Sequence, residues 1–349
     1  MSTTNAPPSH TFTLAILEVQ HQRHNGHRNK STLLSGTGTK PTVVVTDTDE
    51  DANTVLLNYP PGAYTAMRTF DRLGIMDFSG HVARLASSLS QIHLPESDRA
   101  IGKDEEEEVQ VVKRGLALFR DPVTLKPVMT DVVRRVLKSY FKKKENKEVA
   151  EAKVTVLCTW DVKRNATVLL AHAEPLKAPK ERRCKVEVHG SPRQHATAKD
   201  SQWVRDRAAL EAGLSKDSNE ALLLDEASQN VYEGLSSNFY AFDRQSQSVV
   251  TAPLDSVLQG TILKVVLTVC EQQKIPVLFK FASLKDIDDW EGAFISSTSR
   301  LALPIETLVL PDGSEKKFPE SPSIERIRSL VLQECQRRVE PLLTVQDLE

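Results

Sequence analysis

The chain has 349 residues, and its 45 lysines and arginines against 47 aspartates and glutamates give a formal net charge of −2 at pH 7. This length predicts two domains of roughly 150–200 residues each. A hydrophobic content of 40% is typical of folded chains and not of disordered ones. The near-neutral charge argues against a dedicated nucleic-acid binder, which usually carries a concentrated basic face. No apolar run approaches the roughly 20 residues needed to cross a bilayer, so we expect no membrane partner.

The four cysteines are scattered singly, without a Cys-x-x-Cys pair. Such usage is typical of a reducing compartment, and the cysteines do not form the closely spaced pairs with which zinc sites are normally built. His21, His24 and His27 are three residues apart, but their polar neighbours favour a solvated surface loop over a metal site. The N-terminus lacks the apolar core of a secretory signal. We therefore expect a cytoplasmic protein, with a weak organellar transit peptide as the alternative.

The first half of the chain, residues 1–174, is predicted to form a smaller α/β domain. Apolar and β-branched runs predict its strands at 11–19, 42–46, 63–70, 153–160 and 166–172. A helix is expected to begin at 79–81, because Val82, Leu85 and Leu89 recur at helical spacing. A longer amphipathic helix is expected over 124–148. The acidic run 104–108 indicates a solvated loop or a helix start.

Residues 175–182 place prolines among charged residues and are predicted to be an interdomain linker. Residues 183–349 would then form the second domain, in which strands and helices alternate. Strands are expected there at 184–188, 221–225, 238–242, 248–251, 277–281 and 293–297. Helices are expected at 201–212, 261–272, 284–288 and 323–338. Because both halves mix strands and helices, the chain is predicted to be an α/β or α+β protein.

The sequence contains none of the common dinucleotide, P-loop, hydrolase-elbow or zinc-protease motifs. Two other segments in the second half suit an anionic ligand. Gly260-Thr261-Ile262 opens a predicted helix, whose first N–H groups can bind an anion. Ser296-Ser297-Thr298-Ser299 ends an apolar strand and offers hydroxyls and amides. The ordinary alternatives are a plain helix cap and a plain turn.

Two further residues suit cofactor chemistry. Glu233 lies in a strand–turn–strand region, where its carboxylate can pair with a protonated ring nitrogen or can simply face solvent. Lys199 directly precedes a predicted helix. A lysine partly removed from water has a lowered pKa and can form a Schiff base, whereas most lysines are exposed.

Taken in order, these residues resemble the class IV aminotransferases, the fold-type IV pyridoxal-phosphate family. That family includes branched-chain aminotransferases, D-amino-acid aminotransferases and aminodeoxychorismate lyases. The resemblance runs from about Tyr59 to Leu308. It implies a two-domain fold of the D-amino-acid aminotransferase kind, pyridoxal 5′-phosphate as cofactor, and a homodimer.

The resemblance also implies roles for individual residues. His81-Val82-Ala83-Arg84-Leu85 is similar to the family's His-x-x-Arg-Leu helix, whose arginine holds the cofactor phosphate. Lys199 matches the Schiff-base lysine and is the implied catalytic residue. Glu233 matches the glutamate that faces the pyridine nitrogen. The implied cofactor-binding residues are Arg84, Lys199, Glu233, Gly260, Thr261, Ile262 and Thr298.

The chain departs from the family pattern in three places. The family's Gly-Ile-Thr phosphate turn is here Gly260-Thr261-Ile262, which moves the hydroxyl one residue earlier. The strand at 153–160 lacks the Tyr/Arg or Arg/His groups with which some members bind a substrate carboxylate. The resemblance therefore does not imply a substrate specificity for this chain. Trp203 follows Lys199 here, whereas branched-chain enzymes have a tyrosine slightly further along the chain. Arg205 and Arg207, on the same helix, are interpreted as structural ion-pair partners.

The implied reaction moves an amino group between an amino acid and a 2-oxo acid through an imine of Lys199. One alternative is a β-elimination of the aminodeoxychorismate lyase kind, which needs the same imine but no 2-oxo acid acceptor. Another is a family-like protein that binds pyridoxal phosphate or a partner without catalysis. The altered phosphate turn favours this last interpretation, and the presence of Lys199, Glu233 and Arg84 opposes it.

Overall fold

The computed structural model describes residues 11–20, 42–92, 103–143, 146–177, 179 and 181–349. His21, His24 and His27 lie outside the described residues. Within the described part of the chain, no helix is long and apolar enough to span a membrane.

The chain divides into two compact units. The first contains residues 1–176, 200–204 and 340–349, and the second contains residues 177–199 and 205–339. The two short segments 200–204 and 340–349 therefore belong to the first unit, although the predicted division assigns them to the second domain.

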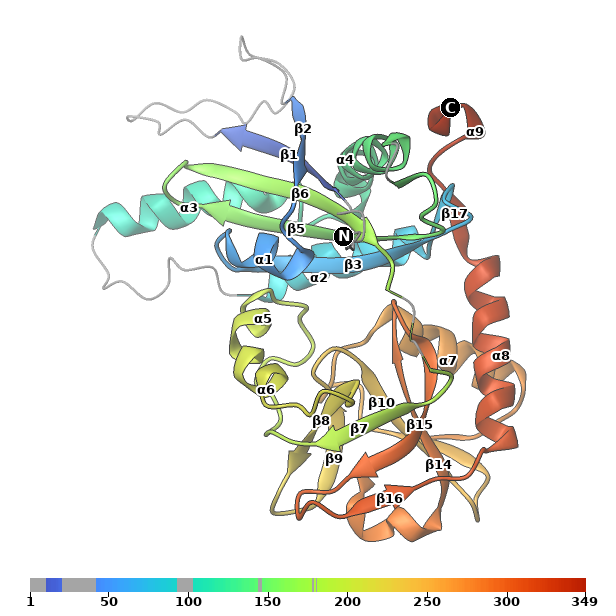
Figure 1. The fold of residues 1–349 in the computed structure, drawn as a ribbon. Helices are drawn as coiled ribbons and strands as arrows, with labels where there is room; N and C mark the ends of the chain where they lie inside the picture. Colours follow the sequence, from blue (N-terminus) through green and yellow to red (C-terminus); the bar gives the residue numbers. More distant parts are fainter. Residues whose placement is uncertain (1–10, 21–41, 93–102, 144–145, 178, 180) are drawn as a thin grey trace, which may run out of the picture. The chain divides into compact units, whose positions relative to one another are not determined.

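The first unit is built on one sheet with the strand order β17-β4-β3-β5-β6-β1-β2, most of whose strands are labelled in Figure 1. Its strands are β1 (Phe12–Gln20), β2 (Val43–Thr48), β3 (Gly62–Phe70), β4 (Gly74–Met76), β5 (Ala152–Asp161), β6 (Ala166–Pro175) and β17 (Val339–Pro341). The five longer strands lie where the sequence predicts strands. Pro175 ends β6 and is not part of a linker.

Helices cover both faces of this sheet. They are α1 (Ala52–Leu57), α2 (Phe78–Gln91), α3 (Lys103–Ala117), α4 (Pro122–Lys142) and α9 (Val345–Leu348). On one face, Val55 and Leu56 of α1 pack with Leu157, Val168 and Leu170 of the central strands. On the other, α4 packs against β1 and β6, and α2 packs against β3 through the apolar stripe that the sequence predicts. Side chains alternate between the faces of a strand, so a sheet covered on both sides is apolar at nearly every position.

The helix predicted over 124–148 ends earlier, at Lys142. Asp121 caps its first turn by accepting from the N–H of Val123, and Pro122 occupies the first helical position. Lys143 is extended, with φ −67° and ψ 137°. Asn146 is fully buried and donates from Nδ2 to the carbonyl oxygens of Thr11 (3.0 Å) and Tyr140 (3.1 Å). These bonds fix Asn146 next to Tyr140 near the end of α4, within the range predicted to be helical.

The second unit has a larger sheet with the order β12-β11-β10-β14-β15-β7-β8-β9-β13, and β16 pairs with β15. Because β9 also pairs with β10, the strands β10, β14, β15, β7, β8 and β9 form a closed ring around an apolar core. The strands are β7 (Cys184–Val188), β8 (Glu220–Asp225), β9 (Asn230–Gly234), β10 (Asn238–Asp243), β11 (Ser248–Thr251), β12 (Val277–Phe279), β13 (Ala282–Ser283), β14 (Trp290–Ser297), β15 (Leu301–Val309) and β16 (Glu315–Lys317).

The remaining helices are α5 (Gln202–Asp206), α6 (Ala208–Ala212), α7 (Thr261–Gln272), the 3₁₀ helix η3 (Leu284–Asp289) and α8 (Pro322–Arg337). The bounds of α7 agree with the prediction. The single helix predicted over 201–212 is instead divided at Arg207. This arginine is buried, forms an ion pair with Glu211 and donates from Nη1 to the carbonyl oxygen of Leu235 at 2.9 Å. The ion-pair role predicted for Arg207 is confirmed.

Candidate active site

Glu233 lies near the end of β9 and is only 4% exposed, so it is not the surface residue that a turn would suggest. Its Oε1 accepts from Nε of Arg193 at 2.7 Å, and its Oε2 accepts from the N–H of Leu258 at 3.0 Å. Burial raises the pKa of the Glu233 carboxyl, while the positive charges of Arg193 and Lys199 act against that rise. A buried carboxylate is therefore held beside two cationic residues.

Arg193 connects this carboxylate to the segment that leads into Lys199. Its side chain is 8% exposed, and it donates from Nη2 to the carbonyl oxygen of Ala196 and from Nη1 to that of Ala198, at 2.5 and 3.3 Å. A guanidinium has a fixed fan of donors, so one side chain can hold several acceptors in a defined geometry. Nothing in the spacing of Arg193 along the sequence marks it as a partner of Glu233, so it is absent from the predicted site residues.

Lys199 is half-buried at the end of the segment that Arg193 fixes. The chain continues directly into Asp200, which forms a β-bridge with Ala63 in the first unit. Ser201 is fully buried, and its Oγ accepts from the N–H of Gly62 at 3.0 Å. Contacts on both sides therefore fix the backbone that carries Lys199.

The predicted phosphate turn lies next to Glu233. Leu258 bonds to Glu233 through its N–H, and its carbonyl oxygen accepts from Nδ2 of Asn238 at 2.7 Å. Gly260 caps α7 without a side-chain hydrogen bond to the helix. A Cβ at Gly260 would lie 2.6 Å from Oδ1 of Asn238, so any side chain there would require Asn238 or the start of α7 to shift. The start of α7 is thus held against the two strands that carry Glu233 and Asn238.

The structure also brings two of the predicted phosphate residues together. Thr261 is 2% exposed, and its Oγ1 lies 3.5 Å from Oγ1 of Thr298. Ile262 is 1% exposed and packs in the core, so only its backbone N–H is suited to an anion. Ser296 is also buried, and its hydroxyl bonds to the Tyr240 hydroxyl at 2.8 Å, so it does not offer a free hydroxyl to a ligand.

Arg84 lies on α2 in the first unit. Its Nη2 donates to Oγ1 of Thr65 at 2.6 Å and lies 3.2 Å from Nδ1 of His81, so these contacts are a hydroxyl and an imidazole instead of a carboxylate. Burial lowers the pKa of Arg84 to about 10, which leaves the side chain charged at neutral pH. Its buried Nε has no hydrogen-bond partner among the described residues. A half-buried cation whose Nε is buried in this way is suited to an anionic ligand.

These features fit a phosphorylated pyridine cofactor. The second unit supplies a buried carboxylate for a ring nitrogen, a half-buried lysine and a glycine-capped helix start with two neighbouring hydroxyls. Arg84 belongs to the first unit, so its role at the phosphate stays a prediction from the family resemblance.

Several solved structures share this fold. A branched-chain aminotransferase of Thermoproteus uzoniensis, solved with norvaline, is 20% identical, with 86% of this chain and 97% of that chain covered and a TM-score of 0.57. A fold IV transaminase of Curtobacterium pusillum is 16% identical, with 93% and 98% covered and a TM-score of 0.62. A hypothetical aminotransferase of Mycobacterium tuberculosis in its PLP-bound form is 17% identical, with 78% and 88% covered and a TM-score of 0.53.

No curated protein sequence matches the chain. The family model described as amino-transferase class IV, however, matches residues 62–308, well over half of the chain. The predicted family, the fold and the cofactor are thereby confirmed. The chain belongs to the class IV aminotransferases, which are pyridoxal-phosphate-dependent enzymes.

Proposed function

We propose that the protein moves an amino group between an amino acid and a 2-oxo acid, with Lys199 as the residue to which the cofactor attaches. The observation that carries the proposal is the contact set of Glu233. This buried carboxylate is paired with Arg193, lies within the electrostatic reach of Lys199 and bonds to the segment that precedes α7.

Pyridoxal phosphate, when bound, withdraws electrons from the substrate carbon that carries the amino group. Glu233 would keep a proton on the ring nitrogen, because Arg193 favours the ionised form of its carboxyl. Lys199, when released by the incoming substrate amine, would carry the proton that this carbon loses. Both roles need groups held within hydrogen-bond reach, and Arg193 fixes the backbone next to Lys199 as well as Glu233.

The phosphate would be bound by the hydroxyls of Thr261 and Thr298 and by the first N–H groups of α7. The family resemblance alone assigns Arg84 to the phosphate as well. The 3.5 Å separation of the two threonine hydroxyls supports a role for Thr261 despite its early position in the turn. Ile262 would contribute its backbone N–H alone, because its side chain is buried in the core.

We further propose a cytoplasmic homodimer that acts on small molecules. All four cysteines are free and buried, which supports a reducing compartment. Light scattering of the purified protein measures the oligomeric state directly.

The proposal is tested by visible absorption before and after borohydride reduction, with peptide mapping of the label. We expect a reducible chromophore that is trapped on Lys199, and turnover that requires a 2-oxo acid acceptor. Lys199→Ala should lose both, whereas Lys285→Ala, at an exposed position of η3, should retain both. Turnover without an acceptor would indicate the lyase alternative. Turnover by Lys199→Ala would overturn the assignment of Lys199.

A further inference from the structure

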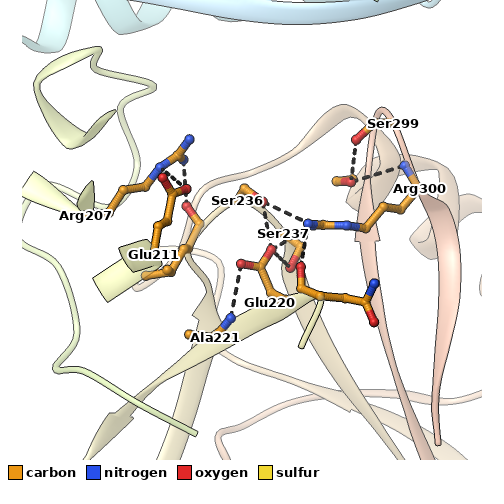
Figure 2. A network of polar contacts seen from close by, with 11 residues as sticks. Arg207, Glu211, Glu220, Ala221, Ser236, Ser237, Ser299 and Arg300 are labelled. Carbon is orange, nitrogen blue, oxygen red and sulfur yellow. Dashed lines mark hydrogen bonds and ion pairs between the residues drawn. The ribbon is translucent and has the colours of Figure 1, made fainter. Parts of the chain in front are cut away.

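Glu220, at the start of β8, is a buried carboxylate outside the residues with proposed cofactor roles. It is 3% exposed, and its Oε2 accepts from Ser236 Oγ at 2.7 Å, from Ser237 Oγ at 3.0 Å and from Arg300 Nη1 at 2.7 Å (Figure 2). Burying a carboxylate is costly unless it is paired and hydrogen-bonded, and here one oxygen has three donors. The cluster is therefore a built feature of the second unit.

Arg300 connects this carboxylate to the turn that carries Thr298. The arginine lies between β14 and β15, two residues after Thr298, and its side chain is 22% exposed. Besides Glu220, it donates from Nη1 to Ser236 Oγ at 3.1 Å and from Nη2 to the carbonyl oxygen of Asn219 at 2.9 Å. One guanidinium thus joins the start of β8, the β9–β10 turn and the β14–β15 turn.

The β9–β10 turn is built closely around Glu220. It begins at Gly234, directly after Glu233, and the N–H of Gly234 donates to the carbonyl oxygen of Ser237 at 2.8 Å. A Cβ at Gly234 would collide with the Ser237 hydroxyl and would lie 3.0 Å from Cγ of Glu220. The turn next to Glu233 is therefore packed directly against Glu220.

We propose that Glu220 and Arg300 are positioning residues that set the separation between the two ends of the cofactor site. One end is Glu233, assigned to the ring nitrogen, and the other is Thr298, assigned to the phosphate. This inference rests on the proposed function. The ion pair holds the turn that follows Glu233 against the turn that carries Thr298, so the phosphate is bound tightly only while the pair is intact.

A positioning role differs from a purely stabilising one in how strongly the loss of the ion pair affects ligands with and without a phosphate. If the pair positions the phosphate end, its loss weakens binding of a phosphorylated ligand more than binding of the same ring without phosphate. If the pair only stabilises the fold, its loss weakens both alike. Pyridoxamine 5′-phosphate and pyridoxamine make this comparison without a covalent bond to Lys199, because neither has an aldehyde.

The experiment measures dissociation constants of both probes for the full-length wild type, Glu220→Gln, Arg300→Lys and the double variant. We expect Glu220→Gln to weaken pyridoxamine 5′-phosphate binding by roughly tenfold or more and pyridoxamine binding by less than about twofold, since the substitution removes a charge-assisted bond. Arg300→Lys should give a smaller loss of the same kind, and the double variant should lose less than the sum of the two. Glu325→Gln removes a more exposed partner of Arg182 in the same unit and should change neither constant.

Equal losses for the two probes, or no loss for either variant, would overturn the positioning role while leaving the proposed function intact. A wild type that binds neither probe would overturn the proposed function and this inference with it. Arg300→Lys keeps the charge beside Glu220, so it provides the comparison where Glu220→Gln fails to fold.

Discussion

Nε of Arg193 lies 2.7 Å from Oε1 of Glu233, and both side chains are nearly buried, at 8% and 5% exposure. The pair joins two parts of the site that are forty residues apart in the sequence. They are the segment that leads to Lys199 and the carboxylate assigned to the ring nitrogen. Because Arg193 also donates to the carbonyl oxygens of Ala196 and Ala198, a movement of Glu233 is coupled to a movement of the backbone next to Lys199.

Arg193→Met removes the positive charge and leaves the Glu233 carboxyl buried, so the pKa of Glu233 should rise further. In the proposed function Glu233 acts in its ionised form, so the acid limb of the activity profile should move to higher pH. We expect kcat at neutral pH to fall by roughly 10- to 100-fold and the free energy of unfolding to fall by about 3–5 kcal/mol, as for other broken buried pairs. A pH–rate profile and a denaturant titration measure the two effects.

Arg193→Lys is the matched control, because it keeps a cation but not the fan of donors. Its acid limb should stay closer to that of the wild type. A profile for Arg193→Met that coincides with the wild-type profile would show that Arg193 does not influence the ionisation of Glu233.

Arg84→Met should separate cofactor affinity from stability. The arginine bears a buried Nε without a partner in the described chain, and burial already lowers its pKa to about 10. Replacing it with an apolar side chain of similar length removes that cost, so the cofactor-free variant should unfold at the same or a higher temperature than wild type. Affinity for pyridoxal phosphate should fall by roughly 10- to 100-fold.

Thermal unfolding with and without cofactor, together with a binding titration, provides the measurement for Arg84→Met. A cofactor-free variant that melts well below the wild type would assign Arg84 to the fold. Unchanged cofactor affinity would remove Arg84 from the phosphate site.

Local sequence patterns predict those helices and strands whose own residues show the typical spacing and end signals. The helix at 261–272 was predicted with its correct bounds, because a glycine precedes a regular apolar stripe. β15 was not predicted: Pro304, which lies within it opposite Phe294 of β14, argues against a strand when read alone. The division between α5 and α6 was also missed, because it depends on Arg207 reaching the distant carbonyl of Leu235.

The same distinction applies to the site. Lys199, Glu233 and Gly260 were identified as candidates because their sequence neighbours resemble a family pattern. Arg193, Glu220 and Arg300 were not, since each acquires its meaning from a partner 40 or 80 residues away. The strand order of the second sheet, in which β7 and β8 lie between β15 and β9, brings the segments that carry these partners together.

Gly260→Ala tests the close packing of the phosphate turn. The added Cβ would meet Oδ1 of Asn238 at 2.6 Å, and Asn238 is itself fixed by its bond to the Leu258 carbonyl. Relief of the clash moves the start of α7 or breaks that bond, at a cost of about 1–3 kcal/mol in the free energy of unfolding. Because Leu258 also bonds to Glu233, we expect cofactor affinity to fall together with stability. Gly213→Ala is the control, since its Cβ would meet its nearest atoms at 3.5 Å or beyond, an ordinary contact distance. Denaturant titration and cofactor binding are measured for both variants, and equal behaviour of the two would show that the turn at Gly260 tolerates a side chain and that its glycine is not required.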